Sequence, residues 1–221
     1  LSVGLPLLAL YAAGRLDLAV YAAFGGLAML YGHGESARQR VTTQIVAGVG
    51  LVVTIAVAMA YSASQAPLTV LGALLAVTVI AAATLGAAMK WVPRGEMFFV
   101  LVLLIVASIP TTWDRLPIGI ATGASGAAFS VLLAWLSNLR NGKRREEPRP
   151  DGWRHRLAAG YANLDRRQHL VLMAAATLGV LTAWTLAIVL GISHPFWAAV
   201  TVAALMPALA ATDIWRPTLH L

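Results

Sequence analysis

The sequence contains no cysteine, which excludes a disulfide framework, a thiolate metal site and a cysteine nucleophile. Charged residues are also scarce, at 11% of the chain, whereas soluble domains carry about 25%. Residues 41–89 and 168–212 contain no Asp, Glu, Lys or Arg at all. These absences argue against a domain that folds in water.

Apolar residues take the place of the missing charges. They make up 59% of the chain, and the mean hydropathy is +0.77. A bilayer core needs about 20 helical residues to cross it, so the run 41–89, interrupted by polar residues and proline at 61–67, predicts two helices and a turn. A membrane β-barrel would alternate apolar and polar residues. We therefore expect an all-α polytopic membrane protein.

The pattern of apolar runs, glycines and prolines predicts eight helices. If the first two helices were one, Arg15 and Asp17 would lie within the membrane, and each charge would add an insertion free energy of about 2.5–3.5 kcal/mol. We therefore expect a break at Gly14. The predicted helices are residues 1–13, 18–31, 41–60, 68–88, 97–109, 116–136, 169–190 and 196–211.

The basic residues segregate when the predicted helices alternate across the membrane. Only Arg15 and Arg115 of the sixteen Lys and Arg residues fall on one side. Because cytoplasmic loops are enriched in Lys and Arg, this pattern predicts that the chain enters from the cytoplasm and that segment 138–168 is cytoplasmic. The net charge of +7 is then explained by these loops, and we do not expect a nucleic-acid partner.

Segment 138–168 carries nine of the sixteen basic residues and is predicted to be a hinge between two membrane units. Trp153, Leu157, Tyr161 and Leu164 recur in it at helical spacing with arginines around them. This pattern favours an amphipathic helix on the inner leaflet, with membrane lipids as partners. Such a helix either anchors the segment at the membrane surface or makes the protein's activity depend on the lipid, and the sequence allows both interpretations.

Sliding the chain against itself by 176 residues indicates an internal repeat. The shift places Tyr21 on Trp197 and Arg40 on Arg216. Both copies read as an apolar helix, a break, an aromatic residue followed by Ala-Ala, a short apolar helix, and a loop that ends in arginine. Since both copies enter from the same side, the predicted repeats are parallel.

The segment His194-Pro-Phe-Trp-Ala-Ala-Val-Thr201, followed by Asp213-Ile-Trp-Arg216, resembles the fusaric-acid-resistance and aromatic-acid-exporter family. In the first copy, Gly25 replaces Thr201 and Tyr31 replaces Pro207. The resemblance implies parallel repeats of a six-helix unit with short first and second helices. It divides the chain into a first repeat (1–137), a basic linker (138–168) and the first two helices of a second, incomplete repeat (169–221).

The resemblance also implies a function, namely proton-gradient-driven export of aromatic carboxylates or similar small organic anions across the bacterial inner membrane. Arginine binds carboxylates bidentately, and aromatic side chains suit a ring. Anchoring by arginine and an interfacial aromatic belt are the alternative readings for the same side chains. The candidate substrate-binding residues are Tyr21, Arg40, Trp197, Thr201 and Arg216.

Gating or proton coupling would fall to charged residues near helix ends. Asp17 forms either part of such a path or a surface pair with Arg15, and Glu35 with Arg38 and Arg40 suggests a cytoplasmic gate. Glu96 also lies near a helix end, and none of these residues forms a compelling relay. The candidates are Asp17, His33, Glu35, Arg38, His194 and Asp213.

Gly119, Gly123 and Gly126 lie on one helical face and permit close approach of another helix, from the same chain or from a second subunit in a homodimer. We expect no enzyme activity, no cofactor and no metal, since no nucleophile elbow is present and the histidines lack ligand spacing. An organic-anion channel related to plant malate channels and a non-transporting membrane scaffold are the alternatives to an exporter.

Overall fold

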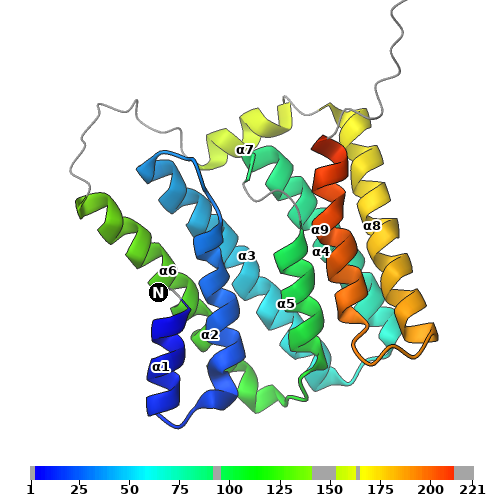
Figure 1. The fold of residues 1–221 in the computed structure, drawn as a ribbon, viewed down its shortest axis with the longest axis horizontal. Coiled ribbons are helices and arrows are strands. Elements are labelled where there is room, and N and C mark those ends of the chain that lie inside the picture. Colours follow the sequence, from blue (N-terminus) through cyan, green and yellow to red (C-terminus); the bar gives the residue numbers. More distant parts are fainter. Residues whose placement is uncertain (1–2, 92–95, 141–152, 163–164, 212–221) are drawn as a thin grey trace, which may run out of the picture.

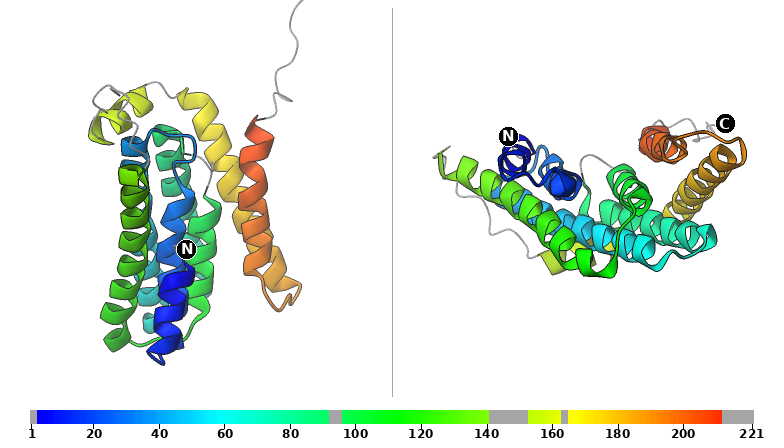
Figure 2. Two further views of the ribbon diagram at one scale, coloured as in Figure 1. Left: turned by 60° about the vertical axis from the view of Figure 1, so that its left-hand side comes forward. Right: turned by 90° about the horizontal axis from the view of Figure 1, so that it is seen from below.

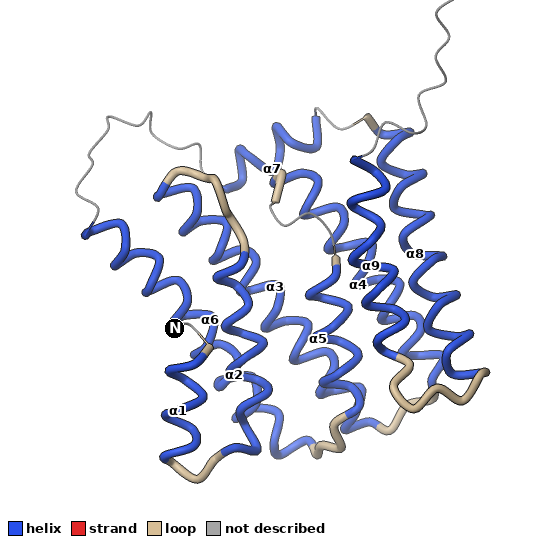
Figure 3. Tube along the Cα trace, viewed as in Figure 1, coloured by secondary structure: helices blue, strands red, loops and turns tan. Residues whose placement is uncertain are grey.

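The computed structural model describes residues 3–91, 96–140, 153–162 and 165–211. Within these ranges the chain is helical and has no strand (Figure 3), which confirms the predicted all-α class. Short 3₁₀ turns at Leu16–Leu18, Leu27–Leu30 and Trp113–Arg115 join some of the helices. The helices are α1 (Gly4–Ala12), α2 (Ala19–Gly26), α3 (Ala37–Ser64), α4 (Leu68–Met89), α5 (Met97–Ser108), α6 (Leu116–Arg140), α7 (Trp153–Ala162), α8 (Arg166–Val189) and α9 (Phe196–Ala211).

The predicted break between the first two helices is confirmed at Gly14. Its φ of +67° lies in the left-handed region that glycine adopts without strain. The Arg15 amide donates to the Leu10 carbonyl at 2.8 Å and the Gly14 amide to the Tyr11 carbonyl at 3.0 Å, which is a Schellman ending. The chain can therefore reverse before Arg15 enters an apolar environment.

The turn between α3 and α4 is shorter than its composition predicts. Residues 61–64 continue α3, and the reversal occupies Gln65, at φ 50°, to Pro67. The Ser62 hydroxyl donates to the Ile109 carbonyl at 2.7 Å. That bond satisfies a polar side chain inside the last helical turn, so the polar run does not end the helix.

Four helices are long and apolar enough to cross a membrane, namely α3, α4, α6 and α8. Only 22–39% of their most apolar windows is buried inside the structure. The outward side chains are themselves apolar, and Val53, Val77 and Leu178 are each more than half exposed. Such helices suggest a membrane-embedded protein, because lipid is the solvent that suits exposed apolar side chains.

The helices form two rows. Viewed from below, α6, α3 and α4 follow one another in one row, and the shorter α2, α5 and α9 lie along one side of it (Figure 2). Helix α5 packs against both α3 and α9, while α8 packs against α4 and α9. The short helices therefore lie beside the long ones instead of extending the row.

Glycine contacts join α2 to α6. A Cβ atom on Gly25 would collide with the Gly123 carbonyl oxygen, and one on Gly126 would collide with the Ala22 carbonyl oxygen. The Ser130 hydroxyl donates to the Gly26 carbonyl at 3.0 Å. The predicted small-residue face of α6 thus meets a helix of the same chain, which answers the question that the sequence left open.

The two ends of the bundle carry different charge. The loop 31–36, the end of α4, the helix α7 and the start of α8 lie at one end, which we call the basic end (Figure 1). Arg15 and Arg115 lie at the other end, where both approach the Asp17 carboxylate, at 3.1 and 3.6 Å. The basic side chains described at the basic end are Arg40, Lys90, Arg154, Arg156, Arg166 and Arg167.

The internal repeat remains a prediction. The two helices that it equates differ in length, since α1 has 9 residues and α8 has 24. The equated aromatic residues also differ in environment, because Tyr21 is 5% exposed and Trp197 is 57% exposed. The Schellman ending of α1 is repeated at Gly191, where the Ile192 amide donates to the Ala187 carbonyl at 3.0 Å.

Candidate functional site

A polar junction occupies the basic end, where the loop 31–36, the start of α3 and the helix α7 meet. We define it by Gly32, Glu35, Arg40, Thr43 and Arg156. Arg156 Nη2 donates to Glu35 Oε1 at 3.0 Å, and the Thr43 hydroxyl donates to Glu35 Oε2 at 2.6 Å. The Arg156 and Glu35 side chains are 19% and 15% exposed. This ion pair is therefore largely shielded from solvent.

Gly32 shapes the loop that carries Glu35. Its φ is +80°, and a Cβ atom there would lie 3.2 Å from Arg40 Cα and 3.3 Å from Glu35 Oε2. Arg40 Nε donates to the Gly32 carbonyl at 3.3 Å. A residue without a side chain is thus needed for the loop to fold back over the first turn of α3, where it brings Glu35 beside Thr43.

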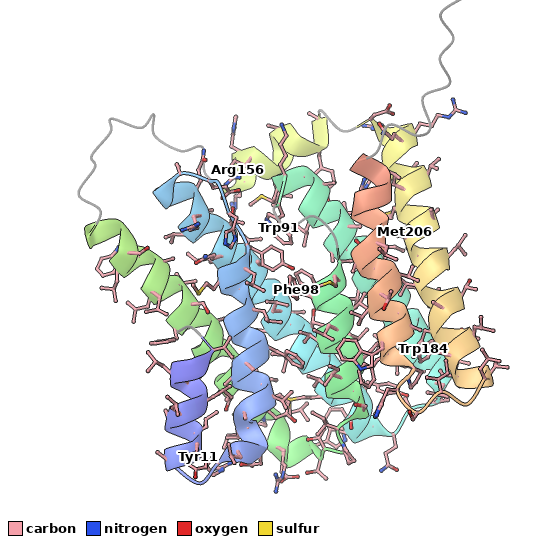
Figure 4. The ribbon with its side chains drawn as sticks, viewed as in Figure 1. Tyr11, Trp91, Phe98, Arg156, Trp184 and Met206 are labelled. Atoms are coloured by element: carbon pink, nitrogen blue, oxygen red, sulfur yellow. The ribbon has the colours of Figure 1, made fainter. Side chains whose placement is uncertain are left out.

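Helix α7 supplies the arginine of the junction. It lies across the basic end, as the predicted interfacial helix would, and Figure 4 labels Arg156 there. It also packs on the end of α4, since a Cβ atom on Gly160 would collide with the Ala88 carbonyl oxygen, and Leu157 packs against the core. A cavity of about 210 Å³ between the two helices is lined by Ala88, Met89, Lys90, His155, Arg156, Ala159 and Gly160.

An aromatic cluster lies beside the junction and is defined by Tyr31, Trp91, Phe98 and Phe99. The Tyr31 and Trp91 ring centroids are 5.0 Å apart, and the Trp91 and Phe99 rings stack at 6.1 Å. Tyr31 and Trp91 are fully buried, and Figure 4 shows Trp91 and Phe98 inside the bundle. Because Tyr31 immediately precedes Gly32, the cluster fixes one end of the loop that carries Glu35.

Within the part of the chain that the structure describes, four buried polar atoms near this cluster have no hydrogen-bond partner: Tyr31 Oη, Gln44 Oε1, Trp91 Nε1 and Glu96 Oε1. Gln44 is held there because its Nε2 donates to the carbonyls of Met29 and Tyr31, at 3.2 and 3.3 Å. Burial raises the pKa of the Glu96 carboxyl. Burial also raises the pKa of Tyr31, and the nearby Glu96 charge adds to that effect.

The predicted site residues of the basic end are only partly brought together. Glu35 and Arg40 belong to the polar junction, but Glu35 pairs with Arg156 and not with Arg40. His33 is exposed, with Nδ1 2.8 Å from the Leu30 carbonyl oxygen. The Arg38 side chain, Asp213 and Arg216 lie outside the described residues.

The other predicted site residues are far from this junction. Tyr21 is buried beside Gly119 of α6. Trp197 and Thr201 are exposed on α9, where the Thr201 hydroxyl donates to the Trp197 carbonyl at 2.8 Å. The segments that begin α2 and α9, with Asp17 and His194, lie at the end opposite α7 (Figure 1). The arginine and the aromatic candidates therefore do not form one pocket.

Sequence reasoning overlooked several residues of this region. The helical pattern predicts Arg156 on the polar face of an interfacial helix, but its side chain turns toward Glu35. Thr43 and Gln44 stand in a charge-free run that was assigned to the lipid phase. One signal was present: Gln44 is the single amide side chain between residues 41 and 64, and an amide within an apolar helix calls for a buried partner.

Comparison of the chain with protein-family models, with characterised proteins and with solved structures finds no match. Among the residues that the structure describes, no three His, Asp or Glu side chains are placed to hold a metal ion. The function must therefore be argued from the polar junction, the aromatic cluster and the apolar helices that surround them.

Proposed function

We propose that the protein is a bacterial inner-membrane exporter of aromatic carboxylates or similar small organic anions, driven by the proton gradient, with its basic end in the cytoplasm. The observation that carries this proposal is the shielded Arg156–Glu35 pair at one end of membrane-length helices. Charged side chains within such bundles are costly and mark ion or substrate pathways. The sequence resemblance supplies the substrate class.

The chemistry of the junction suits a carboxylate. Arg156 already binds one carboxylate, that of Glu35, through a single contact of 3.0 Å between Nη2 and Oε1, and a guanidinium can bind a substrate carboxylate through two such contacts. Arg40 lies in the first turn of α3 and brings a second guanidinium to the junction. We propose that an arriving anion displaces Glu35 from Arg156, with Arg40 as a second binding group, and so opens the cytoplasmic entrance.

If the two repeats are equivalent, the second repeat contributes its own residues to the proposed cytoplasmic entrance. Arg216, which the repeat equates with Arg40, would supply another arginine at the same end. Tyr21, Trp197 and Thr201 would then meet the substrate at the opposite end, at the exit stage of alternating access between the two parallel repeats. His194 and Asp213 would flank the second copy of this path.

Replacement of Arg40 by alanine is expected to lower gradient-driven efflux by about tenfold or more, because one charge-assisted hydrogen bond contributes about 1.5–3 kcal/mol. The measurement is efflux of a panel of aromatic acids from vesicles, with and without a protonophore. Arg216→Ala should act alike. Arg15→Ala is the matched control, since Arg15 is exposed at the opposite end, and it should leave efflux unchanged.

Other outcomes separate the alternatives. A steady anion conductance that persists without a proton gradient would identify a channel. Absence of any flux, together with stoichiometric recovery of a partner protein, would identify a scaffold. Flux that survives Arg40→Ala, Arg216→Ala and the protonophore contradicts both the proposed site and the proposed driving force.

A further inference from the structure

Glu96 is a buried carboxyl that forms no ion pair with any residue that the structure describes, although a backbone hydrogen bond lowers its pKa in part. It directly precedes α5 and is 3% exposed, and its Oε1 atom makes no hydrogen bond. Buried charges in proteins are paired or hydrogen-bonded, and an unpaired carboxylate in an apolar site takes up a proton instead. Burial of Glu96 therefore shifts its protonation equilibrium toward the neutral carboxylic acid.

Among the described residues, the groups around Glu96 do not supply a compensating charge. Tyr31 is the titratable neighbour whose pKa the Glu96 charge affects, and it stays neutral. On the other elements of the basic end, Glu35 and Arg156 neutralise one another. Arg40 donates to the Gly32 carbonyl, and Lys90, at the end of α4, is exposed.

The same region holds unused hydrogen-bonding groups. The Tyr31 hydroxyl and the Trp91 N–H are both buried and have no acceptor among the described residues. Neither donor is hydrogen-bonded to Glu96 in this arrangement, so a carboxylate there would favour an arrangement that brings a donor within reach, whereas the carboxylic acid needs one less. A change in the protonation of Glu96 therefore changes which arrangement of the aromatic cluster is the more stable one.

We propose that Glu96 is the proton-binding site of this protein, which releases and takes up its proton only when the aromatic cluster opens. In the step, the Glu96 carboxylic acid gives H⁺ to water and becomes a carboxylate, and the reverse step restores the acid. The role of Glu96 as carrier of the coupling proton depends on the proposed exporter function. Its role as a proton-binding site depends on the structure alone.

The direction of the pH effect follows from linkage. Because the pKa of Glu96 is raised in the closed arrangement, its contribution to the stability of that arrangement is full below the ordinary carboxyl pKa. That contribution is lost as the pH rises through the raised value. The thermal unfolding midpoint of the wild-type protein should therefore fall as the pH rises from the ordinary carboxyl pKa through the raised pKa of Glu96. Glu96→Gln, which resembles the neutral acid in shape, should lose this part of the pH dependence.

The decisive experiment is infrared spectroscopy of the protein in lipid vesicles as the pH is raised. We expect the carbonyl band of a protonated carboxyl that persists to higher pH than the bands of the exposed carboxyl groups, absent from Glu96→Gln and present in Glu35→Gln, the matched control. Arg94→Gln is measured alongside, because Arg94 is two residues away and lies outside the described residues. Should Glu96→Gln fail to fold, Glu96→Asp must retain a titrating band.

A wild-type spectrum in which no carboxyl band persists beyond those of the exposed carboxyl groups would overturn the proposal, as would such a band that appears only in Arg94→Gln. Transport is then tested separately. Glu96→Gln should lose gradient-driven efflux while it keeps substrate exchange that needs no gradient. A band that titrates in a protein without any flux leaves the proton site standing and refutes the exporter, whereas gradient-driven efflux by Glu96→Gln refutes the coupling role.

Discussion

Replacement of Gly25 by alanine is expected to destabilise the protein by about 3 kcal/mol or more. The added Cβ atom would collide with the Gly123 carbonyl oxygen and would lie 3.0 Å from the Ala127 amide nitrogen. Both atoms belong to the backbone of α6, so no side-chain rotation can make room, and α2 must move away from α6. That movement would also break the Ser130–Gly26 hydrogen bond. The measurement is thermal unfolding of the purified protein in detergent.

Gly86→Ala is the matched control for this substitution. Gly86 lies inside α4, and a Cβ atom there would be 3.7 Å from Trp91 Cε3, which is an ordinary contact distance. Because alanine favours helix over glycine, this variant should be as stable as the wild type or slightly more stable. Equal stability of Gly25→Ala and Gly86→Ala would contradict the close packing of α2 on α6.

The second large effect concerns the Arg156–Glu35 pair. The substitution Arg156→Met should lower the free energy of unfolding by about 2 to 3 kcal/mol. This is less than the roughly 3 to 5 kcal/mol for a fully buried pair, because both side chains retain some exposure. A double-mutant cycle with Glu35→Gln should give a coupling energy of about 1 to 2 kcal/mol. Since Arg156 is the link between α7 and the loop 31–36, its loss should also expose α7 to proteolysis.

The Arg15–Asp17 pair provides the control cycle. Its side chains are 46% and 41% exposed, and exposed pairs contribute little because water and salt screen them. Arg15→Met with Asp17→Asn should therefore show little coupling. A coupling at Arg156–Glu35 as small as in this control would mean that α7 is held by apolar packing alone, and the proposed gate would lose its basis.

Much of the fold could be predicted because the residues at the ends of apolar helices indicate where each helix stops. Gly14 and Pro67 mark reversals through their own backbone preferences, and charge-free runs set helix lengths. The extent of α3 was underestimated at both ends. Its first turn contains Arg40, and its last turn contains Ser62. A polar residue at a helix end favours a loop when its sequence neighbours alone are considered. In the structure, hydrogen bonds to the carbonyls of Gly32 and Ile109 satisfy Arg40 and Ser62 within the helix.

The site was less predictable because its contacts join segments far apart in sequence. Glu35 and Arg156 are separated by more than a hundred residues, and no local pattern pairs them. Tyr31, Trp91 and Glu96 each look like ordinary residues of a loop or a helix end. Their common burial depends on how α5 packs against α3 and α4, which periodicity does not specify.

The orientation of the bundle is the premise of the whole account, and cysteine labelling tests it most directly. The chain has no cysteine, so a single introduced thiol reports alone. In intact cells a membrane-impermeant maleimide should label Thr112→Cys and Ser193→Cys, at the end opposite α7. It should label His33→Cys and Gln168→Cys, at the basic end, only after the membrane is opened. Labelling of all four in intact cells, or the reverse pattern, would contradict a membrane protein whose basic end faces the cytoplasm.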